Sequence, residues 1–442
     1  MLAREEFGRA EIDAWVDEDA ALVDRSIFVD PDIYRLEQQR IFQTCWLYLG
    51  HESEIPNPGD YVTRTMSEDP VILARGQDGR IRAFLNSCSH RGTLVCRADH
   101  GNTRVFKCPY QAWIYDNQGA LVALAHTTEF YEDELKLSQL GLKQVAQLDT
   151  YAGLIFATWS PQAPPLGEYL GDLRFYLDLY FQRTPGGMEV LGPPHRWMMQ
   201  ANWKVGAVNF GSDGPHAVVV HGPVTDATLG KGGADLFTDV LLKCPSISTG
   251  TGHNGIYIAN PEGMPPFASY PQELIPRYRE ALDEVQFDLL SNMLSGVQTT
   301  FPNFSWVQAP VSFSPDEPPV SFLAARVWNP RGPERTEIWD WFFVEKEAPE
   351  AWKRMSMRNA VRTFSTAGTF DQDDAEAWAG INQAFRGDVA RQQKVNFQAV
   401  RAFRNKRIDD FPGPGRVYPS AYGEVTEFDV LLTWKRLMMA QA

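Results

Sequence analysis

Apolar and polar positions follow different patterns in successive parts of the chain. Over residues 1–45, apolar side chains recur at helical spacing among acidic ones, which predicts short helices. From about residue 46 to 160, short apolar runs alternate with Gly, Pro and Asp turns, a pattern typical of an all-β domain. The clearest strand-like runs are 61–65, 71–74, 81–85 and 154–159. The pattern therefore predicts a helical segment followed by a small β domain.

A proline-dense segment at 160–167 separates this β domain from a longer mixed region, because closely spaced prolines end regular structure. Beyond it the pattern predicts helices at 169–182, 281–290, 351–362 and 373–390, and strands at 190–201, 320–328 and 337–344. We therefore expect an α+β protein with boundaries near residues 45 and 160.

Composition narrows the class of protein. With 442 residues, 44% of them hydrophobic, and with 13 Trp and 26 Phe, the chain can bury a large core. A net charge of −15 argues against nucleic acid as a partner, since phosphate binding needs a basic face. No apolar run reaches the length of a membrane span. Five scattered cysteines and a charged N-terminus without an apolar leader predict a cytoplasmic protein.

Two short cysteine loops carry the first candidate chemistry. One reads Cys88-Ser-His90-Arg-Gly, and the other, Cys108-Pro-Tyr-Gln111, begins after 17 intervening residues. Paired loops of this kind resemble the frame of a Rieske [2Fe–2S] cluster, in which two thiolates hold one iron and two imidazoles hold the other. Gln111 stands where the second imidazole is expected.

A second motif contains His216 and His221, five positions apart. Two histidines and one carboxylate can bind Fe(II) on one face and leave positions open for O₂ and substrate. Residues five apart point about 140° apart on an ideal helix, so this segment needs a kink or a π-type turn to aim both imidazoles at one ion. We expect the carboxylate in the acidic run 371–376, where spacing alone leaves Asp373 and Asp374 open.

Further motifs support a resemblance along essentially the whole chain. They are Asn-Trp-Lys at 202–204, Asp-x-x-His-x4-His at 213–221, Phe-Pro-Asn at 301–303, Arg-x-Trp-x-Pro at 326–330 and Gln-Asp-Asp-x-Glu-x-Trp at 372–378. With the cysteine loops, the chain resembles the large (α) subunit of aromatic-ring-hydroxylating dioxygenases, Rieske non-haem iron oxygenases of the naphthalene/biphenyl type. The resemblance implies an all-β Rieske domain (46–160) inserted near the N-terminus of a helix-grip catalytic domain of antiparallel sheet and helices (1–45 and 161–442).

The resemblance also implies roles for individual residues. The implied cluster ligands are Cys88, His90 and Cys108, with Gln111 in the fourth place. The implied ligands of the mononuclear iron are His216, His221 and Asp374. Asp213 matches the residue that joins the two centres across a subunit boundary, and Asn209 matches one close to the iron. Positions lining or flanking the substrate pocket are Phe210, Ala217, Phe364, Phe370 and Trp378, although each aromatic residue there is also compatible with plain core.

The implied activity is that of a terminal oxygenase, which adds O₂ to an aromatic hydrocarbon and forms a cis-dihydrodiol. Electrons would come from NADH through a reductase and a ferredoxin. The implied cofactors are the Rieske cluster and a mononuclear Fe(II), and the implied assembly adds a small β subunit in an α3β3 ring.

Gln111 leaves other interpretations open, because an amide is a poor iron ligand. It is compatible with an introduced His→Gln change, with a nearby group such as His100 or water completing the cluster, or with a natural loss of the ligand. The chain could then bind an aromatic ligand without efficient turnover. A hydroxylase of a substituted aromatic acid is a further alternative, which a pocket Arg or Lys would favour. Ala112 stands where the family commonly has Gly, which is tolerable if its φ stays negative.

Overall fold

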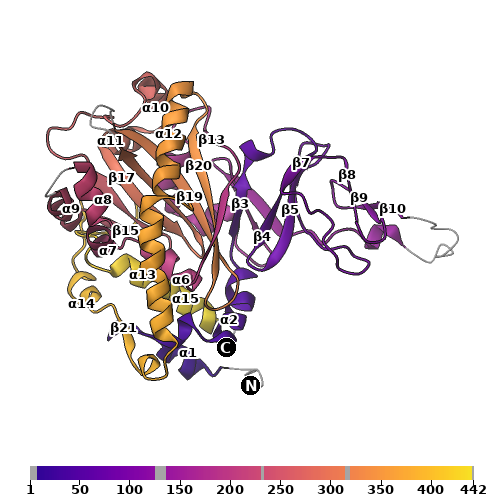
Figure 1. Cartoon of the computed structure of the whole chain (residues 1–442), viewed down its shortest axis with the longest axis horizontal. Coiled ribbons are helices and arrows are strands. Elements are labelled where there is room, and N and C mark those ends of the chain that lie inside the picture. The colour runs from indigo at the N-terminus through magenta and orange to yellow at the C-terminus, as the bar shows by residue number, and fades with distance from the viewer. Residues whose placement is uncertain (1–6, 125–135, 230–232, 314–318, 441–442) are drawn as a thin grey trace. The chain divides into compact units, whose positions relative to one another are not determined.

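The computed structural model describes residues 7–124, 136–229, 233–313 and 319–440. The chain forms two compact units (Figure 1): the larger combines Met1–Ile41 with Gly167–Ala442, and the smaller is Phe42–Leu166. The α+β class predicted from the sequence is confirmed, with a small β unit inserted near the N-terminus of a unit of helices and antiparallel strands. No helix within the described residues is long and apolar enough to cross a membrane.

The smaller unit consists of short antiparallel sheets. Their strand orders are β6-β5-β4-β7, β10-β9-β8 and β11-β12-β3. The strands are β3 (Leu47–His51), β4 (Asp60–Met66), β5 (Asp69–Arg75), β6 (Ile81–Leu85), β7 (His100–Asn102), β8 (Val105–Lys107), β9 (Ile114–Asp116), β10 (Leu121–Ala123), β11 (Gln147–Tyr151) and β12 (Leu154–Thr158). All four strand-like runs predicted from the sequence are strands here. Cys88 and Cys108 are buried in one apolar cluster with Phe106, Trp113 and Tyr115.

The larger unit is built on one antiparallel sheet of order β13-β20-β19-β18-β17-β16-β15-β22, with β14 also paired to β20. Its strands are β13 (Met188–Val190), β14 (His195–Met199), β15 (Ser246–Ser248), β16 (Asn254–Ala259), β17 (Met293–Thr300), β18 (Phe304–Val311), β19 (Val320–Pro330), β20 (Thr336–Glu345) and β22 (Arg416–Tyr418). Every residue of β19 is buried, because helices pack on the central strands. A separate small sheet joins β1 (Val16–Asp17), β2 (Leu22–Asp24) and β21 (Lys394–Asn396).

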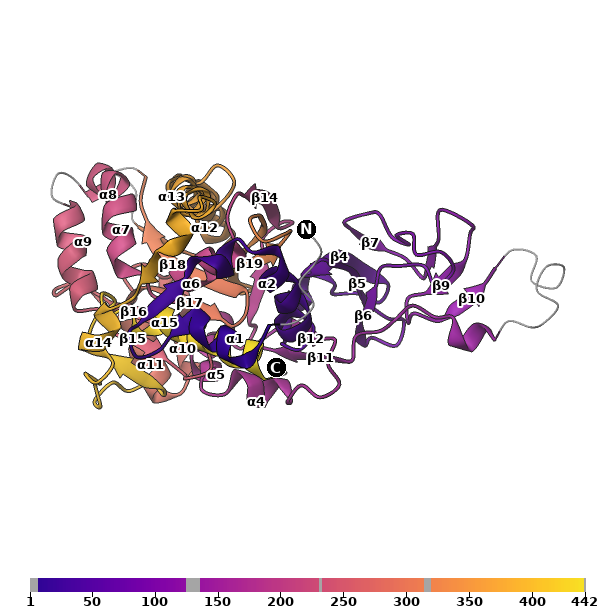
Figure 2. The same ribbon diagram turned by 90° about the horizontal axis from the view of Figure 1, so that it is seen from below.

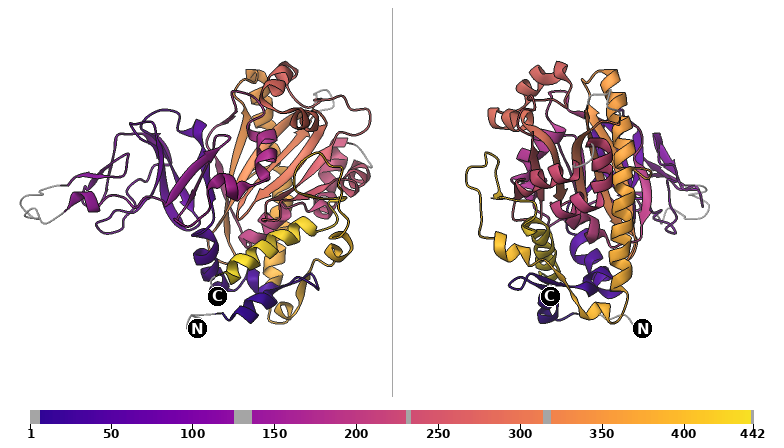
Figure 3. Two further views of the ribbon diagram at one scale, coloured as in Figure 1. Left: turned by 180° about the vertical axis from the view of Figure 1, so that it is seen from behind. Right: turned by 60° about the vertical axis from the view of Figure 1, so that its left-hand side comes forward.

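Helices cover this sheet and place the site. Three helices, α7 (Gly214–Val220), α8 (Gly222–Leu229) and α9 (Gly233–Leu242), lie side by side (Figure 2). On one side of the sheet run α12 (Glu350–Thr363) and α13 (Thr369–Phe385), and α15 (Val425–Met439) is seen in front when the unit is viewed from behind (Figure 3). The other α-helices are α1 (Arg9–Trp15), α2 (Pro31–Glu37), α4 (Leu166–Leu170), α5 (Leu173–Phe181), α6 (Trp203–Asn209), α10 (Ile275–Ala281), α11 (Glu284–Ser291) and α14 (Ala399–Phe403).

Three predicted helices have the wrong bounds. The helix expected at 169–182 is divided into α4 and α5, and Gly171 between them has a left-handed φ of 49°. The helix expected at 281–290 is divided, because Leu282 is extended and Asp283 caps α11 by accepting a hydrogen bond from the Gln286 backbone N–H. The helix expected at 373–390 begins four residues earlier, at Thr369, and ends at Phe385.

A buried ion pair joins three helices beneath the site. Lys204 in α6 pairs with Glu37 in α2, and both side chains are fully buried. The indole N–H groups of Trp203 and Trp434 also donate to the Glu37 carboxylate, at 3.0 and 2.7 Å. Because α6 leads directly to the site, this pair ties the N-terminal segment and α15 to the site scaffold.

Candidate active site

A break between two helices brings the two histidines together. Helix α7 ends at Val220, His221 occupies its C-cap with φ −96° and ψ 1°, and α8 begins at the next residue. This is the kink that the five-residue spacing requires. At the start of α7, the Asp213 carboxylate caps the helix by accepting from the His216 backbone N–H at 3.2 Å. His216 Nδ1 lies 2.5 Å from the Asp213 carbonyl oxygen, to which it donates, so Nε2 is left free to bind a metal.

Asp374 supplies a carboxylate opposite these histidines. Its Oδ1 lies 3.7 Å from His216 Nε2 and 3.4 Å from His221 Nε2. Donor atoms of the three residues all lie within 4.8 Å of one another, and the described part of the chain contains no other such group of His, Cys, Asp or Glu. Asp373, by contrast, is exposed. The geometry therefore favours Asp374 over Asp373 as the carboxylate of the site.

The electrostatics of this group fit a divalent cation. Both Asp374 oxygens and the His221 Nδ1 are buried without a hydrogen-bond partner. Burial raises the pKa of Asp374 to about 7, and burial together with neighbouring His216 lowers the pKa of His221 to about 3. A buried carboxylate without a partner costs free energy, and a cation held between it and neutral imidazoles removes that cost.

The buried Arg326, to which the sequence analysis assigned no role, holds the helix turn that carries Asp374. Arg326 in β19 donates to both oxygens of Asp371, at 2.7 and 3.0 Å, and pairs with Asp340 at 3.0 Å. Asp371 precedes Asp374 by three residues in α13, so the guanidinium anchors the helix turn that carries the candidate ligand. The single positive charge of Arg326 faces the three buried carboxylates of Asp340, Asp371 and Asp374. A divalent ion between Asp374 and the histidines would therefore balance the charge. The sequence motifs contain Arg326 but do not reveal its partners.

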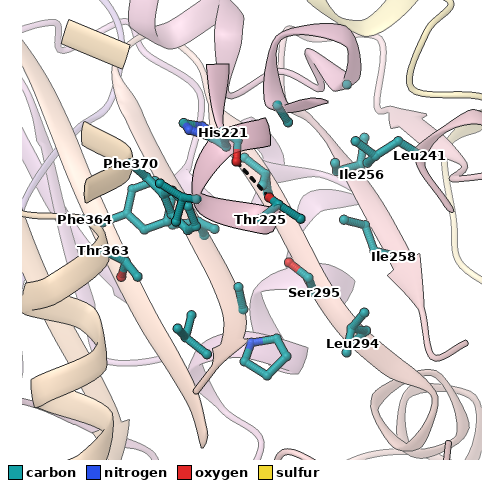
Figure 4. A pocket seen from close by; sticks show the side chains of 18 of the residues that line it. His221, Thr225, Leu241, Ile256, Ile258, Leu294, Ser295, Thr363, Phe364 and Phe370 are labelled. Carbon is teal, nitrogen blue, oxygen red and sulfur yellow. Dashed lines mark hydrogen bonds between the residues drawn. The ribbon is translucent and has the colours of Figure 1, made fainter. Parts of the chain in front are cut away.

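An apolar cavity of about 570 Å³ opens from these donor atoms. In Figure 4, Phe364 and Phe370 lie on one side of it and Ile256, Ile258 and Leu294 lie on the other. Four predicted pocket residues line it: Phe210, Ala217, Phe364 and Phe370. Asn209 and Asp213 also reach its wall. The cavity therefore joins the predicted iron site to a space for an apolar ligand.

Two polar side chains of the cavity wall already donate hydrogen bonds to backbone carbonyls of the protein. The hydroxyl of Thr225 donates to the His221 carbonyl at 2.8 Å, as Figure 4 shows, and that of Ser295 donates to a backbone carbonyl at 2.6 Å. Among the described wall residues the ionisable ones are Asp213, His216, His221 and Asp374, and no Lys or Arg is present. The described wall therefore offers no cationic partner for an acidic substituent of a ligand away from the metal donors.

Trp378 lies elsewhere than the other predicted pocket residues. It lines a smaller neighbouring cavity of about 160 Å³, which also touches Asn209 and Asp213. Its ring packs edge-on against Trp328, with centroids 5.5 Å apart. The structure thus places Trp378 behind the ligand cavity and next to Asp213.

The two cysteine loops share one backbone pattern. Each cysteine N–H donates to the carbonyl five residues on, at 2.9 Å for Cys88 and 2.8 Å for Cys108. Each cysteine carbonyl accepts from the N–H four residues on, which belongs to Gly92 at 2.8 Å and to Ala112 at 3.1 Å. Gly92 and Ala112 both have left-handed backbones, with φ of 76° and 60°. The condition under which alanine is tolerable at this position, a negative φ, is therefore not met, because the loop needs a left-handed residue there.

Three of the four expected cluster donors fit a [2Fe–2S] cluster. Both cysteines are buried and unpaired, and the Cys88 Sγ lies 3.2 Å from the Tyr115 hydroxyl. His90 stacks on Trp113, with centroids 4.7 Å apart and ring planes 3° from parallel. The three donors do not form a set within 4.8 Å of one another, as expected if the cysteines bind one iron and His90 binds the other. Gln111, in the fourth place, is exposed, and its amide is a poorer iron donor than an imidazole.

Ala112→Gly is expected to stabilise the smaller unit by about 1 kcal/mol, because glycine adopts the left-handed conformation without the Cβ clash. Denaturant midpoints of the two proteins measure this. The matched control is Ala120→Gly, an exposed residue of the same unit without a positive φ, and this change is expected to destabilise. Equal losses in both variants would contradict the assignment of strain to Ala112.

Two family models match the chain. The Rieske [2Fe–2S] domain model matches residues 45–146, and the model of the ring hydroxylating alpha subunit (catalytic domain) matches residues 167–410. These matches fall in the smaller and the larger unit, respectively.

Relatives of known name agree with these models. The chain is 35% identical to the benzene 1,2-dioxygenase subunit alpha of Pseudomonas putida, over 98% of this chain and 95% of that protein. It is 34% identical to the biphenyl 2,3-dioxygenase subunit alpha of Rhodococcus jostii, over 97% and 91%. A crystal structure of naphthalene 1,2-dioxygenase from Rhodococcus sp. bound to indole matches 98% of both chains at 37% identity with a TM-score of 0.93. The chain therefore belongs to the alpha subunits of Rieske-type aromatic-ring-hydroxylating dioxygenases, oxidoreductases that use a [2Fe–2S] cluster and a mononuclear iron.

Proposed function

We propose that this chain is the terminal oxygenase component that adds O₂ to a neutral aromatic hydrocarbon and forms a cis-dihydrodiol. The observation that carries the proposal is the convergence of His216, His221 and Asp374 at the end of the apolar cavity. Three protein donors on one side of a metal leave positions facing the cavity.

The residues of the site have separate tasks in this proposal. Fe(II) bound by His216, His221 and Asp374 would supply the O₂ chemistry. The Asp374 carboxylate contributes negative charge, and Asp213 fixes the orientation of the His216 ring through its backbone carbonyl. The apolar walls exclude water and hold the ring of the substrate beside the metal donors.

Volume and polarity indicate the substrate class. A cavity of about 570 Å³ lies within the usual range for pockets that enclose small organic ligands, so it has room for fused or linked aromatic rings. The lack of Lys and Arg in the described wall argues against the aromatic acids considered above, since a buried carboxylate would stay unpaired.

Partners and location complete the proposal. Electrons would come from NADH through a reductase and a ferredoxin to the cluster, and Asp213 would receive them from a neighbouring subunit. A small β subunit would complete an α3β3 assembly. The five cysteines are buried and form no disulfide, which supports the cytoplasmic location expected from the sequence.

The test compares matched neutral and carboxylated substrates. Iron-loaded, chemically reduced protein is exposed to O₂ in a single turnover with biphenyl or with biphenyl-4-carboxylate. We expect a diol from biphenyl and at least about 100-fold less product from the acid, because the described wall of the cavity offers its carboxylate no Lys or Arg. Equal or better conversion of the acid would overturn the proposed substrate class. If neither compound is converted by protein with both centres loaded, the proposed activity is wrong.

A further inference from the structure

The second cysteine loop keeps the shape of a cluster-binding loop without its imidazole. Its two backbone hydrogen bonds repeat those of the first loop, residue for residue from the cysteine. Ala112 even holds the left-handed conformation that Gly92 holds in the first loop, despite the cost of its Cβ. The loop backbone therefore does not depend on a histidine at position 111.

No other described histidine of the smaller unit is placed to replace it. His51 is buried in β3, where its Nδ1 lies 2.9 Å from the Ser53 hydroxyl and 3.2 Å from the Ser53 backbone N–H. His100 lies in β7, three strands from β6 in the order β6-β5-β4-β7, and β6 is the strand that leads into the Cys88 loop. At a strand spacing of about 4.8 Å, that is roughly 14 Å across the sheet. Within residues 42–124 and 136–166, His90 is thus the remaining imidazole beside the cysteine loops.

Gln111 itself is a weak substitute. Its neutral amide is a poorer iron donor than an imidazole nitrogen, which suits iron well. The residue is also exposed in the single chain, so the described part of the chain does not itself cover this position. Among the described residues, the ligand set is therefore one donor short, at a position that the single chain leaves uncovered.

We propose that the iron bound by His90 keeps one coordination position that no imidazole of the described residues fills, and that this position takes a small neutral nitrogen donor such as free imidazole. The inference rests on the proposed function, since it presupposes that Cys88, His90 and Cys108 hold the cluster. It goes further by assigning to this chain an exchangeable ligand site at the cluster. Because the loop backbone is already in place, Gln111→His alone is expected to close that site.

Pulsed electron paramagnetic resonance of the reduced cluster tests the inference without measuring activity. The full chain is labelled uniformly with ¹⁵N, reduced with dithionite and mixed with unlabelled imidazole. In the natural chain we expect one strongly coupled histidine ¹⁵N and a new ¹⁴N coupling after imidazole is added. In Gln111→His we expect two histidine ¹⁵N couplings and no ¹⁴N coupling. Gln118→His, the same change at another exposed glutamine of this unit, is the matched control and should behave like the natural chain.

Three results would overturn the inference. Two histidine ¹⁵N couplings in the natural chain would mean that another histidine fills the position. An absent ¹⁴N coupling would mean that the position is closed to imidazole. A cluster that assembles only in Gln111→His would mean that three protein donors are insufficient. The proposed function fails separately, if Gln111→His with both centres loaded converts no aromatic substrate.

Discussion

Asp374→Asn is expected to remove the mononuclear iron and to lower aromatic product formation by at least about 1,000-fold. Among the described residues, this carboxylate is the one anionic donor facing both histidine Nε2 atoms, at 3.4 Å from His221 and 3.7 Å from His216. An amide of the same shape has no charge and is a poor ligand for Fe(II). The measurement is iron in excess of acid-labile sulfide, which counts the mononuclear iron apart from the cluster, together with single-turnover product.

Asp373→Asn is the matched control, because it makes the same change one residue away on an exposed position. It should keep both the excess iron and the product. Unfolding of the metal-free proteins separates ligand loss from misfolding. Metal-free Asp374→Asn should be no less stable than the metal-free natural chain, because the change removes a buried carboxylate whose oxygens have no partner. Loss of excess iron in Asp373→Asn, with retention in Asp374→Asn, would reverse the assignment.

The choice between Asp373 and Asp374 could not be made from the spacing of residues in the sequence. Adjacent residues on a helix point about 100° apart, so the choice depends on where the helix starts and which face it buries. The pattern started this helix at residue 373, whereas α13 starts at Thr369 after an extended Gly368. Only the packing of α13, held by Arg326 and Asp371, aims Asp374 at the histidines.

Strands with a strong local pattern of apolar residues were predicted correctly, whereas strands that depend on distant contacts were missed. The apolar runs of β19 and β20 are unambiguous strands because nearly every position is buried. Strands β16 and β17, which pair with each other, were not predicted, because they combine glycines with buried polar residues such as Gln298. Gly255 is required there, because a Cβ would lie 2.3 Å from the Gln298 Cγ of the paired strand. Such a requirement appears only once the two strands are paired.

The candidate ligands were found because their chemistry is local in the sequence. Cys88 and His90, and likewise His216 and His221, are spaced so closely that residue type and spacing reveal them together. Arg326 was not given a role, since its partner Asp371 lies 45 residues away and nothing in the local pattern links them. The left-handed Ala112 was missed for a related reason, because its conformation follows from the loop hydrogen bonds and not from its residue type.

Glu37→Gln is expected to destabilise the larger unit by about 3–5 kcal/mol at pH 7, because it leaves the buried Lys204 ammonium without its counter-charge. The amide keeps the shape of the side chain, and its oxygen can still accept from the indoles of Trp203 and Trp434, so the loss reports mainly the charge. Denaturant unfolding of the metal-free proteins gives the free energy. A loss below 1 kcal/mol would mean that Lys204 finds another partner.

The pH dependence of that loss distinguishes an orphaned charge from a packing defect. Burial already lowers the pKa of Lys204 in the natural chain, and removal of the Glu37 charge should lower it further. Between that lowered pKa and the ordinary value near 10.5, the unfolded chain binds more protons than the folded chain, so stability rises with pH. The deficit of Glu37→Gln relative to the natural chain should therefore shrink between pH 7 and pH 9.5.

Adding Lys204→Met to Glu37→Gln should recover at least half of the loss at pH 7, because the charge itself is then gone. A deficit that stays constant with pH, or a double variant as unstable as the sum of both single variants, would assign the effect to packing.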